Sequence, residues 1–179
     1  MQRLMNRAAP SEADRGKPRM VRAEGRHMLE RVVQVSRAAA GLRQEDVYRI
    51  IRTAHAANTL AGISGGLIFL DGWFAHVLEG ASGPAFDACL TRVACDPRHR
   101  DLERRSRERV LCRLFPGQAM ALRTRACLDP GLIEGFGWRP GFPVADFPAD
   151  VLLEFVVRAC RGRDRLPDPR RLAARAPAA

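Results

Sequence analysis

Apolar residues along the first part of the chain follow two different spacings. Valines and other apolar residues dominate residues 29–36, which predicts a first β-strand. Residues 43–57 predict an amphipathic helix, because apolar side chains recur there at three- and four-residue intervals: Val47, Ile50, Ile51 and Ala54. A strand followed by a helix with one buried face is therefore expected.

Two apolar runs, residues 63–70 and 73–79, flank the dipeptide Asp71-Gly72. This dipeptide suits the positive φ angles of a type I′ turn, so the segment predicts a β-hairpin. Both runs are apolar on both faces, which is typical of strands in a sheet covered on each side. Gly65 and Gly66 indicate either a tight packing contact or the close approach of a ligand or another backbone.

A second helix is expected over residues 84–94, with Pro84 in its first turn and a buried stripe of Phe86, Cys89, Leu90 and Val93. The charged, alternating segment 104–115 predicts a strand with one solvated face, and 118–122 a short last strand. The order β-α-β-β-α-β-β predicts an α+β ferredoxin-like sandwich. Residues 123–148 are expected to be irregular, and a helix over 149–160 to cover the open face of the sheet.

The distribution of charge separates a folded body from two tails. The chain of 179 residues has a formal net charge of +10, of which residues 1–27 carry +4 and residues 158–179 carry +5. We therefore expect a disordered basic tail over 1–27, a domain over 28–122, a helical extension over 123–162 and a basic tail over 163–179. The tails are expected to be solvated, and weak nonspecific contact with nucleic acid through them stays open.

Several classes of protein are not indicated. No apolar run is long enough to span a bilayer and the first residues lack a signal-peptide pattern, so a cytoplasmic protein without membrane contact is expected. The five cysteines (89, 95, 112, 127 and 160) and four histidines have no metal-ligand spacing. Phosphate-binding glycine loops are absent, and Asp71 and Glu79 imply no pocket, so no enzyme is expected.

Four pieces of the chain together resemble the BLUF family, the sensors of blue light using FAD. The pieces are Val-x-Val-Ser-Arg-Ala at 33–38, Asn58 with Gly-Ile-Ser-Gly-Gly-Leu at 62–67, Phe74 with Val-Leu-Glu-Gly at 77–80, and Arg92 with Asp-Pro-Arg-His at 96–99. The resemblance covers about residues 28–122.

The resemblance implies that FAD lies between the two helices, and it maps the family's flavin-anchoring asparagine to Asn58. It maps an arginine and an aspartate beside the ring to Arg92 and Asp96. Other interpretations stay open: Asn58 as a helix C-cap, and Arg92 with Asp96 as a surface ion pair.

Two departures from the family affect its photochemistry. The tyrosine that the family keeps on its first strand is replaced by Gln34, and the glutamine on its third strand by His76. On the last strand a tryptophan is replaced by Gln118, while Met120 is kept. An amide has no accessible one-electron oxidation, and imidazole cannot make the amide's tautomer switch, although it can hydrogen-bond a flavin. For His76 a core histidine is the alternative.

Two functions are therefore weighed. The first is an FAD-binding sensory or regulatory module without the normal photocycle; the second is a flavin-free protein of the same origin that acts by protein–protein interaction. In both, an unidentified protein partner or self-association into a homo-oligomer must carry the signal.

Overall fold

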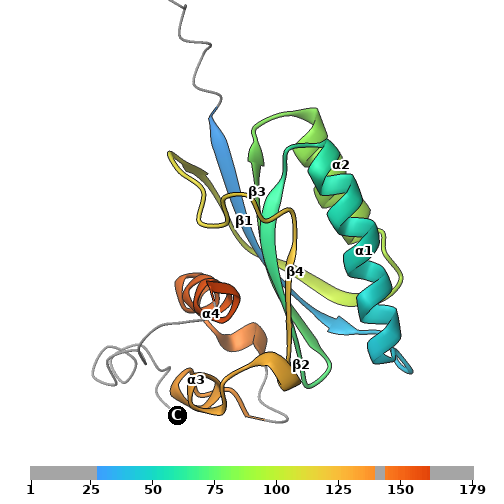
Figure 1. Cartoon of the computed structure of the whole chain (residues 1–179), viewed down its shortest axis with the longest axis vertical. Coiled ribbons are helices and arrows are strands. Elements are labelled where there is room, and N and C mark those ends of the chain that lie inside the picture. The colour runs from blue at the N-terminus through green and yellow to red at the C-terminus, as the bar shows by residue number, and fades with distance from the viewer. Residues whose placement is uncertain (1–27, 140–143, 162–179) are drawn as a thin grey trace, which may run out of the picture.

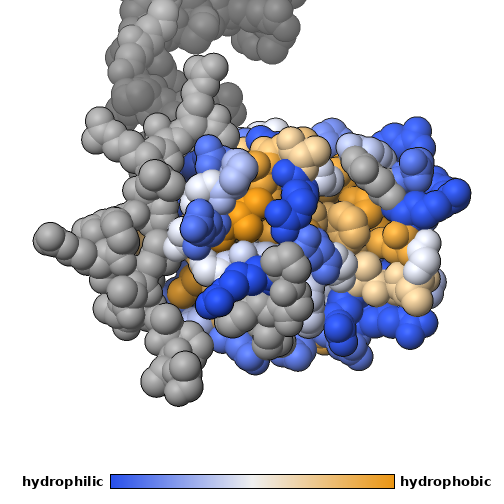
Figure 2. Space-filling model, turned by 90° about the horizontal axis from the view of Figure 1, so that it is seen from below, coloured by the Kyte–Doolittle hydropathy of each residue, from blue (hydrophilic) through white to orange (hydrophobic). Residues whose placement is uncertain are grey.

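The computed structural model describes residues 28–139 and 144–161, which form a sheet with helices on both faces (Figure 1). The tails expected over 1–27 and 163–179 lie outside these residues. Within the described part, no helix combines the length and apolarity that crossing a membrane would require. Seen from below, apolar side chains are exposed between charged ones (Figure 2).

The sheet has five strands in the order β4-β1-β3-β2-β5, and only the β2–β5 pair is parallel. Two helices, α1 and α2, lie side by side on one face (Figure 1). The chain order confirms the ferredoxin-like β-α-β-β-α-β-β arrangement: β1 (Leu29–Ala38), α1 (Gln44–Leu60), β2 (Ser64–Leu70), β3 (Trp73–Ala81), α2 (Pro84–Ala94), β4 (His99–Val110) and β5 (Ala121–Thr124).

The expected hairpin turn is confirmed, because Asp71 and Gly72 have φ angles of +52° and +78°. The Asp71 carboxylate also accepts hydrogen bonds from the guanidinium of Arg125 and from Trp138 Nε1, the latter at 3.2 Å. These bonds join the turn to the segment that follows the sheet. Asp71 therefore adopts the turn conformation and also anchors the segment that follows the sheet.

The expected bounds of the last two strands were wrong. β4 begins at His99 and ends at Val110, instead of covering 104–115, and β5 begins at Ala121 instead of Gln118. The pairing of β4 with β1 contains two register irregularities, and Asp101 in β4 has a φ of +49°. Such bulges allow a strand to continue through positions that break simple alternation.

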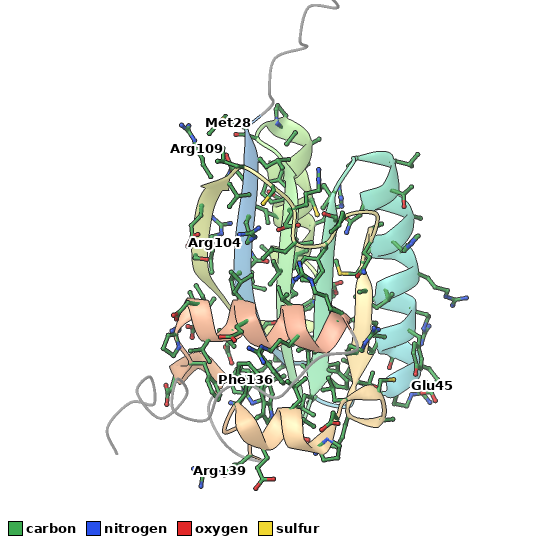
Figure 3. All side chains as sticks on the ribbon, turned by 60° about the vertical axis from the view of Figure 1, so that its left-hand side comes forward. Met28, Glu45, Arg104, Arg109, Phe136 and Arg139 are labelled. Atoms are coloured by element: carbon green, nitrogen blue, oxygen red, sulfur yellow. The ribbon has the colours of Figure 1, made fainter. Side chains whose placement is uncertain are left out.

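The second face of the sheet is covered by α4 (Ala149–Arg161), as expected. The segment 123–148 is more regular than expected, since it contains η2 (Arg125–Cys127), α3 (Pro130–Gly135) and η3 (Val144–Asp146). Phe136 lies between α3 and α4 (Figure 3), with its ring centroid 5.0 Å from that of Phe155. A Cβ on Gly66 would lie 2.7 Å from Cys160 Sγ and from Phe115, so a packing contact explains this glycine.

A separate core lies between the sheet and the two helices α1 and α2. Val47, Ile50, Phe86 and Leu90 are buried there, as expected. Ile51 and Val93 are only partly buried, which differs from the expectation. Val93 borders a cavity in this layer, so its side chain is not fully enclosed.

Candidate functional site

A cavity of about 520 Å³ lies between α1, α2 and the sheet. Its size is within the range of pockets that hold small molecules and cofactors. Most of its walls are apolar, and polar side chains come from the C-terminal halves of α1 and α2, from the connection between α2 and β4, and from the start of β4. These polar lining residues are Thr53, Asn58, Arg92, Asp96, Arg98 and His99.

Gln34 on β1 lies directly opposite His76 on β3, and neither residue is among those that line the cavity. Both side chains face α1 and α2, because their same-face neighbours Val32, Phe74 and Leu78 belong to the core of that side. Gln34 and His76 are 1% and 2% exposed. The amide nitrogen and oxygen of Gln34 and Nε2 of His76 have no hydrogen-bond partner. Buried polar atoms of this kind call for a hydrogen-bonding ligand, because leaving them unpaired is costly.

His99 connects this buried layer with the cavity. Its Nδ1 lies 2.7 Å from Ser36 Oγ, and its ring lies 4.5 Å from that of Phe74 and 6.0 Å from that of His76, measured between centroids. These contacts with β1 and β3 hold the ring of His99 in place. His99 also borders the cavity. His99 is part of the Asp-Pro-Arg-His motif at 96–99. Its contact with Ser36 joins residues 63 positions apart, so local spacing could not predict it.

Asn58 is buried in the last turn of α1, and its side chain crosses to the segment before β5. Asn58 Nδ2 donates to the backbone carbonyl of Ala119 at 2.9 Å, and Cys89 Sγ donates to Asn58 Oδ1 at 3.5 Å. The C-cap of α1 is Ala61, so the C-cap interpretation of Asn58 is wrong. Met120, the next residue after Ala119, is 9% exposed and borders the same cavity.

Arg92 and Asp96 both border the cavity, but they do not form the surface ion pair that was the alternative interpretation. The helix α2 ends at Ala94, so the two residues do not share a helical face. Asp96 instead accepts hydrogen bonds from the backbone and the guanidinium of Arg98, at 2.6 to 3.0 Å. Arg92 is exposed at the mouth of the cavity, where an incoming anionic group could reach it.

The environment keeps the floor of the site neutral at physiological pH. Burial, with a smaller contribution from His99, lowers the pKa of His76 to about 3. Burial also lowers the pKa of His99, although the charge of Asp96 opposes this change. The pKa of the Cys89 thiol is raised by burial, against the effect of Arg92. Neutral imidazoles offer one donor and one acceptor each, so the site suits a ligand with an uncharged, hydrogen-bonding edge.

No metal chemistry is indicated in residues 28–139 and 144–161, where no group of three or more His, Cys, Asp or Glu side chains could hold an ion. The fully buried carboxylate of Glu79 has a structural role. It accepts hydrogen bonds from Arg31 and from the backbone N–H groups of Leu114 and Phe115. These bonds fix the connection between β4 and β5, on the side of the sheet away from the cavity.

The family model described as sensors of blue-light using FAD matches residues 29–121. The chain belongs to the BLUF family. These BLUF residues include all the polar cavity residues and both strands of the Gln34–His76 pair. BLUF domains are sensors rather than enzymes, and the family binds flavin.

Comparison with individual proteins agrees with the family match. The chain is 32% identical over 85 residues to the photoactivated adenylate cyclase subunit alpha of Euglena gracilis, an alignment that covers 48% of this chain and 8% of the relative. The BLUF structure of BlrP1 is 27% identical, covers 79% of this chain and 97% of its own, and has a TM-score of 0.56. BlsA, in a photo-activated state, shares the fold with a TM-score of 0.66, at 19% identity, over 77% of this chain and 99% of its own.

Proposed function

We propose that the protein is a BLUF-type regulatory module that binds FAD between α1 and α2 and lacks the family's usual photocycle. The observation that carries this proposal is the cavity, together with three unpaired, buried polar atoms of Gln34 and His76 on the same face of the sheet. An enclosed set of uncharged donors and acceptors fits the carbonyl and imide edge of a flavin ring. The family match supports flavin as the ligand class.

Six residues would hold the cofactor. Gln34, His76 and Asn58 offer neutral hydrogen-bonding groups to the polar edge of the ring, and Met120 gives an adaptable apolar contact. Arg92 and Asp96 lie at the open end of the cavity, where Arg92 can meet a phosphate. FAD would supply the absorption of blue light. The chain's own residues supply binding, orientation and exclusion of water.

The missing photocycle follows from the chemistry of the two strand residues. Gln34 cannot give an electron to an excited flavin, because its amide has no accessible oxidation. The ring of His76 cannot make the tautomer switch of a primary amide. Light absorbed by the flavin would then be lost without a lasting change in the hydrogen bonds around it.

A regulatory role is proposed from the functions of relatives, which include a bacterial light-regulated adenylyl cyclase. This chain spans 31% of that protein and 8% of the Euglena protein, so the activities of the whole relatives are not assumed for it. We propose that its output is contact with a separate protein partner or with a second copy, and that the described part performs no catalysis.

One observation favours a second candidate, a flavin-free interaction protein. The amide of Asn58 is already engaged by Ala119 and Cys89, so this anchor has partners without any ligand. In this case the cavity would be a remnant. The two candidates differ in one property that can be measured, the affinity of the protein for FAD.

The test is a fluorescence titration of the purified protein with FAD and, separately, with FMN. We expect saturable binding of FAD, and a loss of about 1–3 kcal/mol of binding free energy in Asn58→Ala, because ligand groups lose a buried partner. Thr59→Ala is the matched control, since the hydroxyl of Thr59 bonds only the carbonyl of His55 in its own helix. Absence of binding by the parent would favour the flavin-free candidate, and equal curves for Asn58→Ala and parent would exclude this site.

A further inference from the structure

A second cavity, of about 430 Å³, lies where α1 ends and β2 begins, beside the connection between β4 and β5. No residue lines both this cavity and the one between α1 and α2. The hydrogen bond from Asn58 Nδ2 to the carbonyl of Ala119 joins the walls of the two cavities, because Asn58 lines the first and Ala119 the second. A ligand in the second cavity therefore occupies a site of its own.

Arg113 is the cationic side chain that lines this cavity. Its Nη1 donates to Ser64 Oγ and to the backbone carbonyl of Glu79, and its Nη2 donates to the carbonyl of Gly62, each at 2.7 Å. A guanidinium has five N–H donors, so Nε–H and one N–H of Nη2 have no partner among the described residues. The three bonds hold the side chain in position, and two donors remain for a ligand.

The charge of Arg113 is not neutralised by a carboxylate. The Glu79 carboxylate, which accepts from Ser64 Oγ at 3.4 Å, is paired with Arg31 at 2.7 Å. Arg113 is in none of the ion pairs formed by the described residues, and none of the residues that line the second cavity is acidic. The two guanidinium groups around Glu79 thus leave one positive charge, at the side that faces the cavity.

The remaining walls supply neutral polar groups and an apolar surface. His55 on α1 and Gln118 before β5 are exposed and line the cavity, and their side chains make no hydrogen bond in the described part of the chain. Ile63 is 3% exposed and gives the cavity an apolar wall together with Ala119. A fixed cation, two neutral polar side chains and an apolar wall suit a small molecule with an anionic end.

We propose that the second cavity binds a small organic molecule through a phosphate or carboxylate group, with Arg113 as its charged donor and with His55 and Gln118 at its rim. The planar fork of an arginine matches the oxygen atoms of both groups. A phosphate is expected to bind more tightly, because it has more charge and more acceptor oxygens. The organic part of the molecule lies against Ile63. This site is independent of the flavin function proposed above.

The experiment is a titration of the flavin-free full chain with phenyl phosphate, benzoate and benzyl alcohol, followed by calorimetry and by the NMR signals of the His55 ring. We expect saturable binding of phenyl phosphate with a shift of the His55 signals, weaker binding of benzoate and no binding of benzyl alcohol. Absence of phenyl phosphate binding, or equal binding of benzyl alcohol, would overturn the proposal.

Two variants with the same change in net charge place the anion in the molecule. Gln118→Glu puts a carboxylate at the rim of the cavity, at an exposed side chain, and is expected to weaken phenyl phosphate binding about tenfold. Arg104→Gln, at the opposite edge of the sheet (Figure 3), is the control and is expected to change it less than about twofold. Equal losses in both variants would mean that the anion responds only to net charge, which contradicts a site at Arg113.

Two further variants separate the second cavity from the first. Arg113→Lys keeps the charge but loses the planar fork, and is expected to bind phenyl phosphate about fivefold more weakly. Arg92→Gln removes the arginine at the mouth of the first cavity and should leave the affinity unchanged. Loss of binding in Arg92→Gln with none in Gln118→Glu would place the anion in the first cavity and refute the proposal. A failed FAD titration, in contrast, bears only on the flavin function.

Discussion

Glu79 is the residue on which the connection between β4 and β5 depends. It is fully buried at the end of β3, and its carboxylate lies 2.7 Å from Arg31 Nε. The backbone N–H groups of Leu114 and Phe115 donate to the same carboxylate at 2.9 to 3.1 Å. A buried charge is tolerated when it is paired and hydrogen-bonded in this way. The sequence motif contains Glu79, but nothing local reveals that it binds Arg31, 48 residues earlier, and the N–H groups of Leu114 and Phe115, 35 and 36 residues later.

Glu79→Gln is expected to lower the free energy of unfolding by about 3 kcal/mol, because it leaves Arg31 without its counter-charge in a largely buried position. Chemical denaturation of the flavin-free protein measures this change. Glu103→Gln is the matched control, since Glu103 is 49% exposed at its side chain and its pair with Arg105 should contribute less than about 1 kcal/mol. Equal stabilities of the two variants would contradict the structural role of Glu79.

His76 makes stability depend on pH. Its pKa is about 3 in the folded protein, below its ordinary value of 6.5, because burial disfavours the charged ring. Below pH 6.5 the unfolded chain therefore binds a proton that the folded protein does not bind. Stability is complete above pH 6.5 and falls as the pH is lowered from 6.5 towards 3, by about 2 kcal/mol between pH 7 and pH 5.

The variant His76→Gln isolates this contribution. We expect its free energy of unfolding to fall by about 2 kcal/mol less than that of the parent between pH 7 and pH 5, since its side chain does not titrate. Denaturation curves at the two pH values measure the difference, and His55→Gln, at an exposed position, is the control. Parallel pH profiles for parent and His76→Gln would show that folding does not lower the pKa of His76.

Among the elements, periodicity predicted those whose contacts are local. The helices α1, α2 and α4 and the hairpin were predicted within a few residues, because each has an apolar face or a turn dipeptide of its own. The apolar residues of 110–115 were interpreted as strand. In the structure Leu114 and Phe115 give their N–H groups to Glu79 instead of a strand, and Leu111 is 90% exposed. Long-range capture of backbone groups is not visible in a spacing pattern.

At the candidate site, too, long-range contacts are not visible in the spacing of residues. The sequence motifs placed Asn58, Arg92, Asp96 and His76 on one side of the fold. The pairing of Asp96 with Arg98, in contrast, follows from where α2 ends. Likewise, the role of Ala119 as acceptor for Asn58 depends on the path of an irregular segment. Residue type predicts which chemistry is available, whereas the ends of elements decide which partners meet.

The helix α4 is expected to be a required part of the folded unit. Phe155 is 2% exposed and contacts the rings of Phe136 and Trp138, at centroid distances of 5.0 and 5.5 Å. Phe155→Ala should lower the free energy of unfolding by about 3–5 kcal/mol, since it leaves a cavity in a packed core. Thermal and chemical unfolding measure it, with the partly buried Leu153→Ala as the comparison. A loss below about 1 kcal/mol would mean that α4 folds apart from the sheet.

At the scale of the whole molecule, fold and photochemistry are separable. The family match spans residues 29–121, and the sheet, the helix pair and the cavity are all present. The resemblance implies that the family's light reaction belongs to two strand positions, held here by Gln34 and His76, and both are buried on the face of the sheet that carries α1 and α2. Binding depends on the whole layer between α1, α2 and the sheet, whereas the photocycle depends on two side chains. A member of the family can therefore keep flavin binding and lose the photocycle.

Blue light should consequently produce no reversible red shift in the FAD-loaded protein. Gln34 has no electron to give and His76 cannot switch as an amide does, so either substitution alone disables the cycle, and Gln34→Tyr or His76→Gln alone should also fail. The measurement is a light-minus-dark absorption difference spectrum, recorded for the parent and both single variants. The variant carrying both replacements is the informative comparison, because it restores electron donor and amide switch together and is expected to regain the shift. A red shift in the unmodified protein would contradict the argument and would assign the photochemistry to another side chain, with Tyr48 and Trp73 the first to be replaced by Phe.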